Sequence, residues 1–167
     1  KTREIVDVDF SGISFLDGTN LREDYRQFSQ ELRLTSPGGE AFNYIGGVYY
    51  QHAKLDVQDF TLFNPTFLGL GAPFNALGDT RNDRDYSQTS DLISAFAQGE
   101  LSLTDQLRVT AGARFNHEKK SGRRSLAIVQ GPLSTAPAAV VAAVFRALNI
   151  EAHSIAGKLS EDSFNPM

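Results

Sequence analysis

An alternating pattern over residues 92–116 limits how this chain can fold more than any other feature. Every second side chain is apolar or small over 93–103 and again over 107–115. The residues between them are polar or glycine, with Leu92 and Phe96 as exceptions. Successive side chains of a strand point to opposite faces, so the pattern predicts a hairpin with one apolar and one polar face. Each arm has about ten residues, enough to cross a bilayer when a strand is tilted by about 45°. The apolar face therefore meets either a protein core or lipid.

Weaker alternation predicts further strands over residues 4–10, 25–35 and 42–55. A tight turn at 36–40 joins the last two of these, because its Pro fixes φ and its two Gly residues permit positive φ. Aromatic residues near both ends of the 42–55 strand suit the two aromatic girdles of a membrane barrel.

The predicted connections alternate between short and long. Residues 56–90 and 120–163 show no sustained period, and a further strand could begin at Ser163. Loops longer than about 15 residues are uncommon inside compact soluble domains, whereas outer-membrane barrels combine short periplasmic turns with long extracellular loops.

We therefore predict an all-β fold, an antiparallel transmembrane β-barrel segment with about four full strands plus partial flanking strands. Residues 1–167 would form part of one β-barrel domain, with strands over about 4–10, 25–35, 42–55, 91–103 and 107–119. A soluble antiparallel β-sandwich with elaborated loops is the alternative, because alternation alone does not separate lipid from a core.

Composition and spacing give no sign of an enzyme. The net charge is −4 with scattered basic residues and there is no cysteine, so neither a nucleic-acid surface nor a thiolate metal site is predicted. His52, His117 and His153 lie far apart, without metal-ligand spacing. No nucleophile elbow or phosphate-binding glycine loop is present. We predict no catalytic residue, no metal and no cofactor.

A charged segment, 79–86, is the best candidate for ligand contact. Arg81 and Arg84 would face an anionic ligand and Tyr86 would pack on it, since guanidinium groups suit carboxylate and other anionic oxygens. The alternative is a solvated loop whose charges pair with one another.

Two apolar stretches lie within the predicted long loops. Residues 67–74 are glycine-rich and either pack the loop onto its neighbours or touch a substrate. Residues 137–148 predict a short helix, with Thr135 as N-cap, docked by an apolar stripe or acting as a ligand lid. The stripe comprises Val141, Val144, Phe145 and Leu148.

Five charged residues fall on the polar parity of the strands, namely Glu31, Arg33, Glu100, Arg108 and Arg114. In a barrel they would face the lumen, whereas in a soluble sandwich they would form an ordinary solvated face.

Several segments resemble a known family. Residues 28–37 with 42–51 look like a strand pair in the barrel of TonB-dependent outer-membrane receptors. Residues 93–98, 103–107 and 110–115 are similar to the next hairpin of that family.

The resemblance implies a receptor of about 22 barrel strands in the outer membrane of a Gram-negative bacterium. It also implies a plug, which would meet the five lumen-facing residues, and a TonB box, which engages an inner-membrane energy-coupling complex. The implied cargo is a ferric siderophore or similar nutrient, so the anionic ligand of Arg81 and Arg84 would be a ferric chelate. We expect this chain to be a mid-barrel fragment that contacts outer-membrane lipid, with plug and TonB box elsewhere in the parent chain. A passive porin-like channel is the alternative within membrane proteins.

Overall fold

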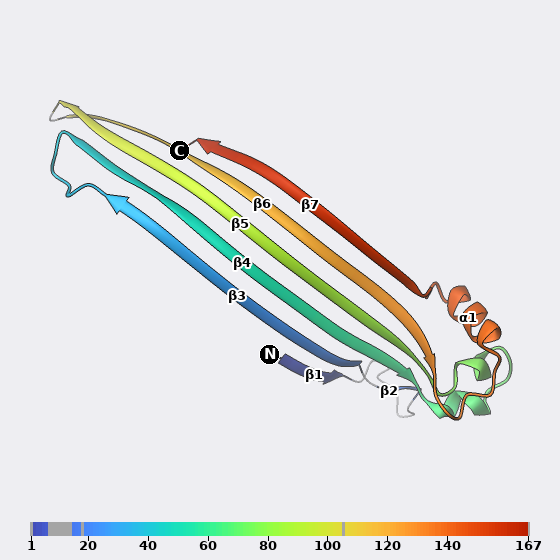
Figure 1. Cartoon of the computed structure of the whole chain (residues 1–167). Helices are drawn as coiled ribbons and strands as arrows, with labels where there is room; N and C mark the ends of the chain where they lie inside the picture. The colour runs from blue at the N-terminus through green and yellow to red at the C-terminus, as the bar shows by residue number, and fades with distance from the viewer. Residues whose placement is uncertain (1, 7–14, 18, 105, 167) are drawn as a thin grey trace. The chain divides into compact units, whose positions relative to one another are not determined.

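The computed structural model describes residues 2–6, 15–17, 19–104 and 106–166. Most of them form one sheet with the strand order β1-β3-β4-β5-β6-β7, in which β2 pairs with β4 (Figure 1). The strands are β1 (Thr2–Val6), β2 (Leu16–Asp17), β3 (Thr19–Thr35), β4 (Phe42–Phe63), β5 (Thr80–Thr104), β6 (Leu107–Gln130) and β7 (His153–Pro166). Their arrows alternate in direction from β3 to β7, so the long strands form an antiparallel meander.

The chain divides into two compact units, which we describe separately. Unit 1 comprises Lys1–Tyr25, Leu55–Gln88 and Gly122–Gly157, and unit 2 comprises Arg26–Lys54, Thr89–Ser121 and Lys158–Met167. Unit 1 contains the helical segments, and unit 2 contains both tight turns between strands.

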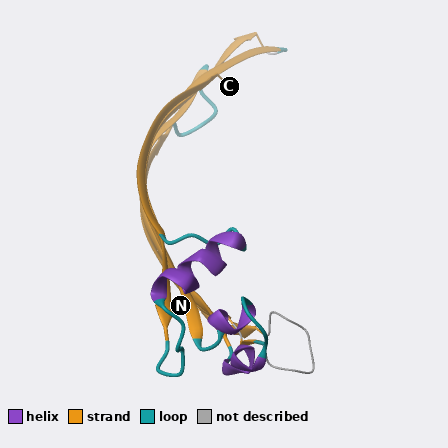
Figure 2. Ribbon diagram, turned by 90° about the vertical axis from the view of Figure 1, so that its right-hand side faces the viewer, coloured by secondary structure: helices purple, strands orange, loops and turns teal. Residues whose placement is uncertain are grey.

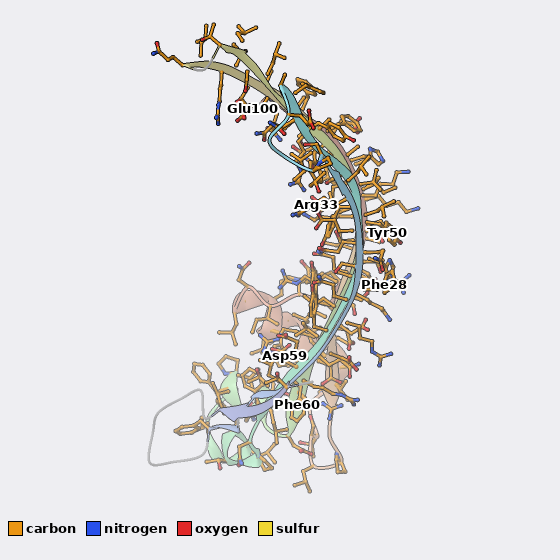
Figure 3. The ribbon with its side chains drawn as sticks, turned by 90° about the vertical axis from the view of Figure 1, so that its left-hand side faces the viewer. Phe28, Arg33, Tyr50, Asp59, Phe60 and Glu100 are labelled. Atoms are coloured by element: carbon orange, nitrogen blue, oxygen red, sulfur yellow. The ribbon has the colours of Figure 1, made fainter. Side chains whose placement is uncertain are left out.

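Unit 2 has an apolar face that is open to its surroundings. The large side chains on it include Phe28, Leu32, Leu34, Phe42, Tyr44, Val48, Tyr50, Ile93, Leu101, Leu103, Leu107, Val109, Phe115 and Phe164, all exposed. They occupy alternate positions of their strands, as expected for one face of a sheet. In Figure 3, Phe28 and Tyr50 lie on one side of the ribbon, and Arg33 and Glu100 lie on the other. The predicted division into an apolar and a polar face is therefore confirmed.

Glycine allows close approach on both faces of unit 2. A Cβ on Gly47 would lie 2.9 Å from Cζ of Phe96, and one on Gly99 would lie 2.9 Å from Cε2 of Phe42. Each aromatic ring thus occupies the space that a side chain on the neighbouring strand would need. This explains Phe96, the apolar exception on the polar face.

Backbone and side-chain hydrogen bonds close the two tight turns. Between β3 and β4, Gly38 and Gly39 have φ values of 83° and 80°, and the Ser36 amide donates to the Tyr44 carbonyl at 2.9 Å. Between β5 and β6, Thr104 Oγ1 accepts from the Leu107 amide at 3.0 Å. The predicted turn at 36–40 is confirmed.

In unit 1, the helical segments pack on the sheet around one small core (Figure 2). They are η1 (Pro65–Gly69), η2 (Phe74–Leu77) and α1 (Ala138–Ala147). The buried core residues are Phe63, Leu77, Val141 and Phe145. The Phe63 and Phe145 rings meet edge to face with centroids 5.0 Å apart. No helix in the described part of the chain is both long and apolar enough to span a membrane.

Asp79 joins the two connections of unit 1. Its φ is 55°, its carboxylate accepts from the Leu133 amide at 2.6 Å, and its carbonyl accepts from the Gly131 amide at 2.7 Å. Gly131 has no room for a side chain, because a Cβ there would collide with the Asp79 carboxylate. The segment after η2 is therefore fixed to the segment before α1.

The strands are longer than the sequence predicted. We predicted loops over 56–90 and 120–163, but β4 continues to Phe63, β5 begins at Thr80, β6 continues to Gln130 and β7 begins at His153. The connections shrink to 64–79 and 131–152. The additional strand segments carry charged or hydroxyl residues on both faces, so they lack the alternation that the prediction required.

Other expectations are partly met. The helix is present as α1, but its N-cap is Pro137 rather than Thr135, and Leu148 at the end of the stripe is exposed. Of the strand predicted over 4–10, β1 covers the first part, and residues 7–10 lie outside the described residues. The β-sandwich alternative is wrong for the described part of the chain, whose long strands form one sheet.

Candidate functional site

The polar face of unit 2 carries all the residues that we predicted to face a lumen. Arg33 pairs with Glu31 at 2.6 Å on β3, and Arg108 lies 3.8 Å from Glu100 across β6 and β5. Arg114 donates to Asn116 Oδ1 at 2.8 Å and to Ser94 Oγ at 3.2 Å. The face is therefore a row of charged groups joined by local hydrogen bonds.

Ser94 and Asn116 link three strands on this face. Ser94 Oγ donates to Asn116 Oδ1 at 2.6 Å, and Asn116 Nδ2 donates to Ser163 Oγ at 3.1 Å. Ser94 is fully buried. Sequence reasoning placed both residues on the polar parity but did not single them out, because charge alone was used to choose candidates.

Glu118 extends the row along β6. Its carboxylate accepts from Ser90 Oγ at 3.0 Å and lies 3.0 Å from the Lys120 ammonium. The hydrogen bond from Lys120 is the largest influence on the pKa of Glu118 and lowers it below its ordinary value. Desolvation opposes this, and the hydrogen bond from Ser90 lowers the pKa further.

In unit 1, an ion pair joins β4 and β5 on the face that carries Phe63. Arg84 reaches Asp59 through Nε at 3.0 Å and through a second nitrogen at 2.7 Å, and it donates to Thr61 Oγ1 at 3.0 Å. Asn82 Oδ1 accepts from the Thr61 amide at 3.2 Å. Two-point contact of this kind suits the planar guanidinium.

The three predicted ligand residues do not converge. Arg81, Arg84 and Tyr86 lie on strand β5, not in a loop, so odd and even positions point to opposite faces. Arg81 pairs with Asp83 at 2.6 Å and lies over the Phe60 ring, 5.1 Å from its centroid. Arg84 and Tyr86 share the other face. Arg81 pairs within the segment, as the alternative interpretation expected, whereas Arg84 pairs with Asp59 on β4, outside the segment.

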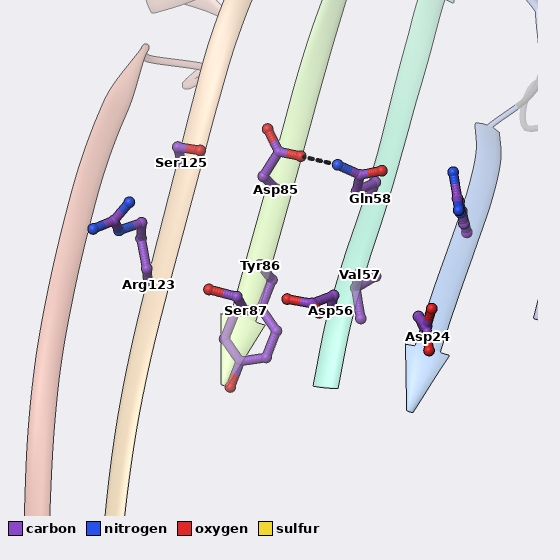
Figure 4. A pocket seen from close by; sticks show the side chains of 10 residues that line it. Asp24, Asp56, Val57, Gln58, Asp85, Tyr86, Ser87, Arg123 and Ser125 are labelled. Atoms are coloured by element: carbon purple, nitrogen blue, oxygen red, sulfur yellow. Dashed lines mark hydrogen bonds between the residues drawn. The ribbon is translucent and has the colours of Figure 1, made fainter. Parts of the chain in front are cut away.

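A cavity of about 340 Å³ lies beside β5 in unit 1, on the same side as Arg81. Gln58 donates to Asp85 at 3.1 Å across its floor (Figure 4). The charged residues that line it are Arg22, Asp24, Asp56, Asp85 and Arg123. Both signs of charge are present, and no group of carboxylates or histidines among the described residues has the arrangement of a metal site.

On the apolar side of unit 2, a polar row follows the last apolar residues of the strands. This border row consists of Arg26, His52, Asp91, His117 and Asp162, each two positions beyond Phe28, Tyr50, Ile93, Phe115 and Phe164. Sequence analysis found no metal-ligand spacing for His52 and His117 and assigned them no partners. His153, the third histidine, contacts the Glu151 carbonyl instead.

Histidine–aspartate pairs join neighbouring strands within the border row. His52 Nδ1 lies 2.7 Å from Asp91 Oδ1, and His117 Nδ1 lies 2.5 Å from Asp162 Oδ1. Tyr50 Oη also donates to Asp91 at 3.2 Å. The hydrogen bond to His52 is the main cause that lowers the pKa of Asp91.

Comparisons with known proteins support the fold. A crystal structure of the ferric yersiniabactin uptake receptor FyuA from Yersinia pestis matches with a TM-score of 0.64 and 18% identity. The match covers 92% of this chain and 19% of that receptor, so this chain spans about a fifth of the receptor's length. The cryo-EM structure of the pneumolysin membrane pore complex, at 10% identity over 88% of this chain and 31% of that one, has a TM-score of only 0.14.

No curated protein matches the sequence. The family model described as TonB dependent receptor-like, beta-barrel, matches residues 4–141, which is most of the chain. This match confirms the resemblance in the strand pairs and hairpin. The chain belongs to the TonB-dependent receptor-like β-barrel family.

Proposed function

We propose that this chain is a barrel segment of an active importer in the outer membrane of a Gram-negative bacterium. The family match over residues 4–141 carries the proposal. Because the chain spans 19% of the FyuA receptor, uptake is proposed for the longer protein and not for this segment alone. The plug and the TonB energy-coupling complex are the partners that such a protein needs.

The two faces of unit 2 support different contacts. The apolar face suits outer-membrane lipid, because hydrocarbon offers no hydrogen-bond partners to polar side chains. The polar face suits a water-filled lumen in which Glu31, Arg33, Glu100, Arg108 and Arg114 meet a plug. Water in the lumen would solvate those of the charged groups that are not paired with one another.

A ferric siderophore or similar chelate is the proposed cargo. FyuA, which has the same fold, is described as a ferric yersiniabactin uptake receptor. Arg84 and Tyr86 are the remaining ligand candidates, since they share a face, whereas Arg81 lies on the opposite face. An anionic ligand would have to compete with Asp59 for the Arg84 guanidinium.

Uptake by the host bacterium tests the proposal. We expect deletion of the encoding gene to abolish saturable uptake of at least one radioiron-labelled ferric siderophore, and we expect loss of TonB to have the same effect. Complementation with the whole gene is the control. Uptake that persists without TonB would contradict active transport and indicate a passive channel.

A further inference from the structure

A second cavity, of about 390 Å³, lies in unit 2 next to the border row. Its lining includes Thr89, Lys119, Ser121, Lys158 and Ser160. The His117–Asp162 contact fixes the register of β6 and β7, so Lys119 comes opposite Ser160 and Ser121 comes opposite Lys158. Side chains at every second position of a strand point to the same face. Lys119 is four positions after Phe115 and Lys158 is six positions before Phe164, so both lysines lie on the apolar side, beyond the border row.

The cavity has an excess of positive charge. Asp91, the carboxylate that lines it, is already bound by His52 and Tyr50. Lys120 pairs with Glu118 on the opposite face. Within the part of the chain that the structure describes, no salt bridge engages Lys119 or Lys158, and Lys119 attracts the Asp91 carboxylate only as a nearby charge. Two ammonium groups thus share one cavity with hydroxyl groups from Thr89, Ser121 and Ser160.

We propose that Lys119 and Lys158 bind a phosphate group on a lipid headgroup of the outer leaflet. The proposal rests on the proposed membrane location, because the apolar face sets the level at which headgroups begin. Lysines just beyond that level meet phosphate rather than hydrocarbon, and ammonium groups bind phosphate as point charges. The surrounding hydroxyl groups donate hydrogen bonds to phosphate oxygens.

The test uses the full-length receptor in detergent, titrated with bisphosphorylated lipid A and observed by native mass spectrometry. We expect Lys119→Gln and Lys158→Gln each to weaken binding about fivefold, and the double variant about 25-fold, as expected for basic residues at an anionic surface. Lipid A stripped of its phosphates should bind the unaltered receptor as weakly as the double variant binds intact lipid A.

Lys54→Gln is the matched control, because Lys54 is an exposed lysine of unit 2 that does not line the cavity. We expect it to change binding less than twofold. Unchanged binding in the double variant would overturn the proposal. An equal loss in Lys54→Gln would also overturn it, by showing diffuse attraction. Competition by millimolar inorganic phosphate as strong as that by lipid would assign the site to free phosphate and overturn the lipid assignment.

The outcome separates this inference from the proposed function. Membrane fractionation and siderophore uptake are measured on the same variants, with heat-modifiable electrophoretic mobility as the check on folding. A receptor that inserts and transports normally but shows no lysine-dependent lipid binding contradicts this inference alone. A receptor absent from the outer membrane contradicts the proposed function.

Discussion

Arg84 shows how single residues hold neighbouring strands together on the face that carries the core. Its guanidinium is one-third exposed and meets Asp59 and Thr61. We expect Arg84→Gln to lower the free energy of unfolding by about 1 kcal/mol, because partly exposed ion pairs contribute little more. Urea titration of the whole receptor measures the change. Arg124→Gln, an exposed arginine on the neighbouring strand β6, should have less than half this effect, and equal effects would contradict the role of the ion pair.

Asp91 gives the border row a defined pH response. Its pKa in the folded protein lies below the ordinary value of 3.8, mainly because of the hydrogen bond to His52. A depressed pKa stabilises the fold above pH 3.8, and this contribution is lost as the pH falls through the folded pKa. We expect His52→Gln to raise the pKa of Asp91 toward the ordinary value, measured by carboxyl chemical shifts across a pH titration.

His153→Gln is the control for this titration, because His153 contacts a backbone carbonyl and not a carboxylate. Its substitution should leave the Asp91 titration unchanged. If the pKa of Asp91 stays the same after His52→Gln, a group other than His52 lowers that pKa.

Among the elements, α1 depends on one buried ring. Phe145 is fully buried against Phe63, so Phe145→Ala removes an aromatic contact and leaves a cavity. Such changes cost about 3–5 kcal/mol. Because the core of unit 1 is local, we expect faster amide hydrogen exchange over 131–152 rather than unfolding of the whole barrel. Leu148→Ala, at an exposed position one residue beyond α1, should leave exchange nearly unchanged, and similar exchange in both variants would contradict the packing.

The spacing of β5 and β6 depends on Gly112. A Cβ there would lie 2.9 Å from the Ala97 carbonyl oxygen, whereas a Cβ on Gly122 of the same strand would lie 3.8 Å from its nearest neighbour. We therefore expect Gly112→Ala to lower the urea midpoint of the barrel and Gly122→Ala to leave it unchanged. Equal midpoints for the two variants would mean that the backbone relaxes without cost.

Sequence alone predicted those parts of the strands that have one apolar face. The segments 56–63, 80–90 and 120–130 escaped prediction because both of their faces carry polar residues. Most of strand β7 was not predicted for a related reason. Its apolar residues do not share one face, because Ile155 and Leu159 lie on one parity and Phe164 on the other. Periodicity detects a strand only where its two faces differ in polarity. Where both faces are polar, it gives no signal.

The candidate site was predictable to a similar extent. The charged residues of the polar face follow from parity, and the structure places all of them there. The grouping of Arg81 with Arg84 failed because it assumed a loop, in which neighbours in sequence can point the same way. The histidine–aspartate pairs require the register of strands far apart in sequence, which a single sequence does not specify.

At the scale of the whole molecule, the two faces should meet different solvents. Val109 and Thr110 are neighbours on β6 that point to opposite faces. In intact outer membranes, we expect Thr110→Cys to react faster than Val109→Cys with a charged maleimide, which reaches water but not hydrocarbon. The order should reverse with a lipid-soluble maleimide. The same order with both reagents would contradict a lipid-facing apolar side.

The contact between Asp79 and the segment 131–133 has a mechanical consequence for unit 1. Two connections that are separated by the whole of β5 and β6 in sequence are tied at one carboxylate and one carbonyl. Displacing either connection strains the other, so the two behave as a single moving part rather than as independent flaps. A displacement of the segment containing η1 and η2 will therefore carry the α1 connection with it.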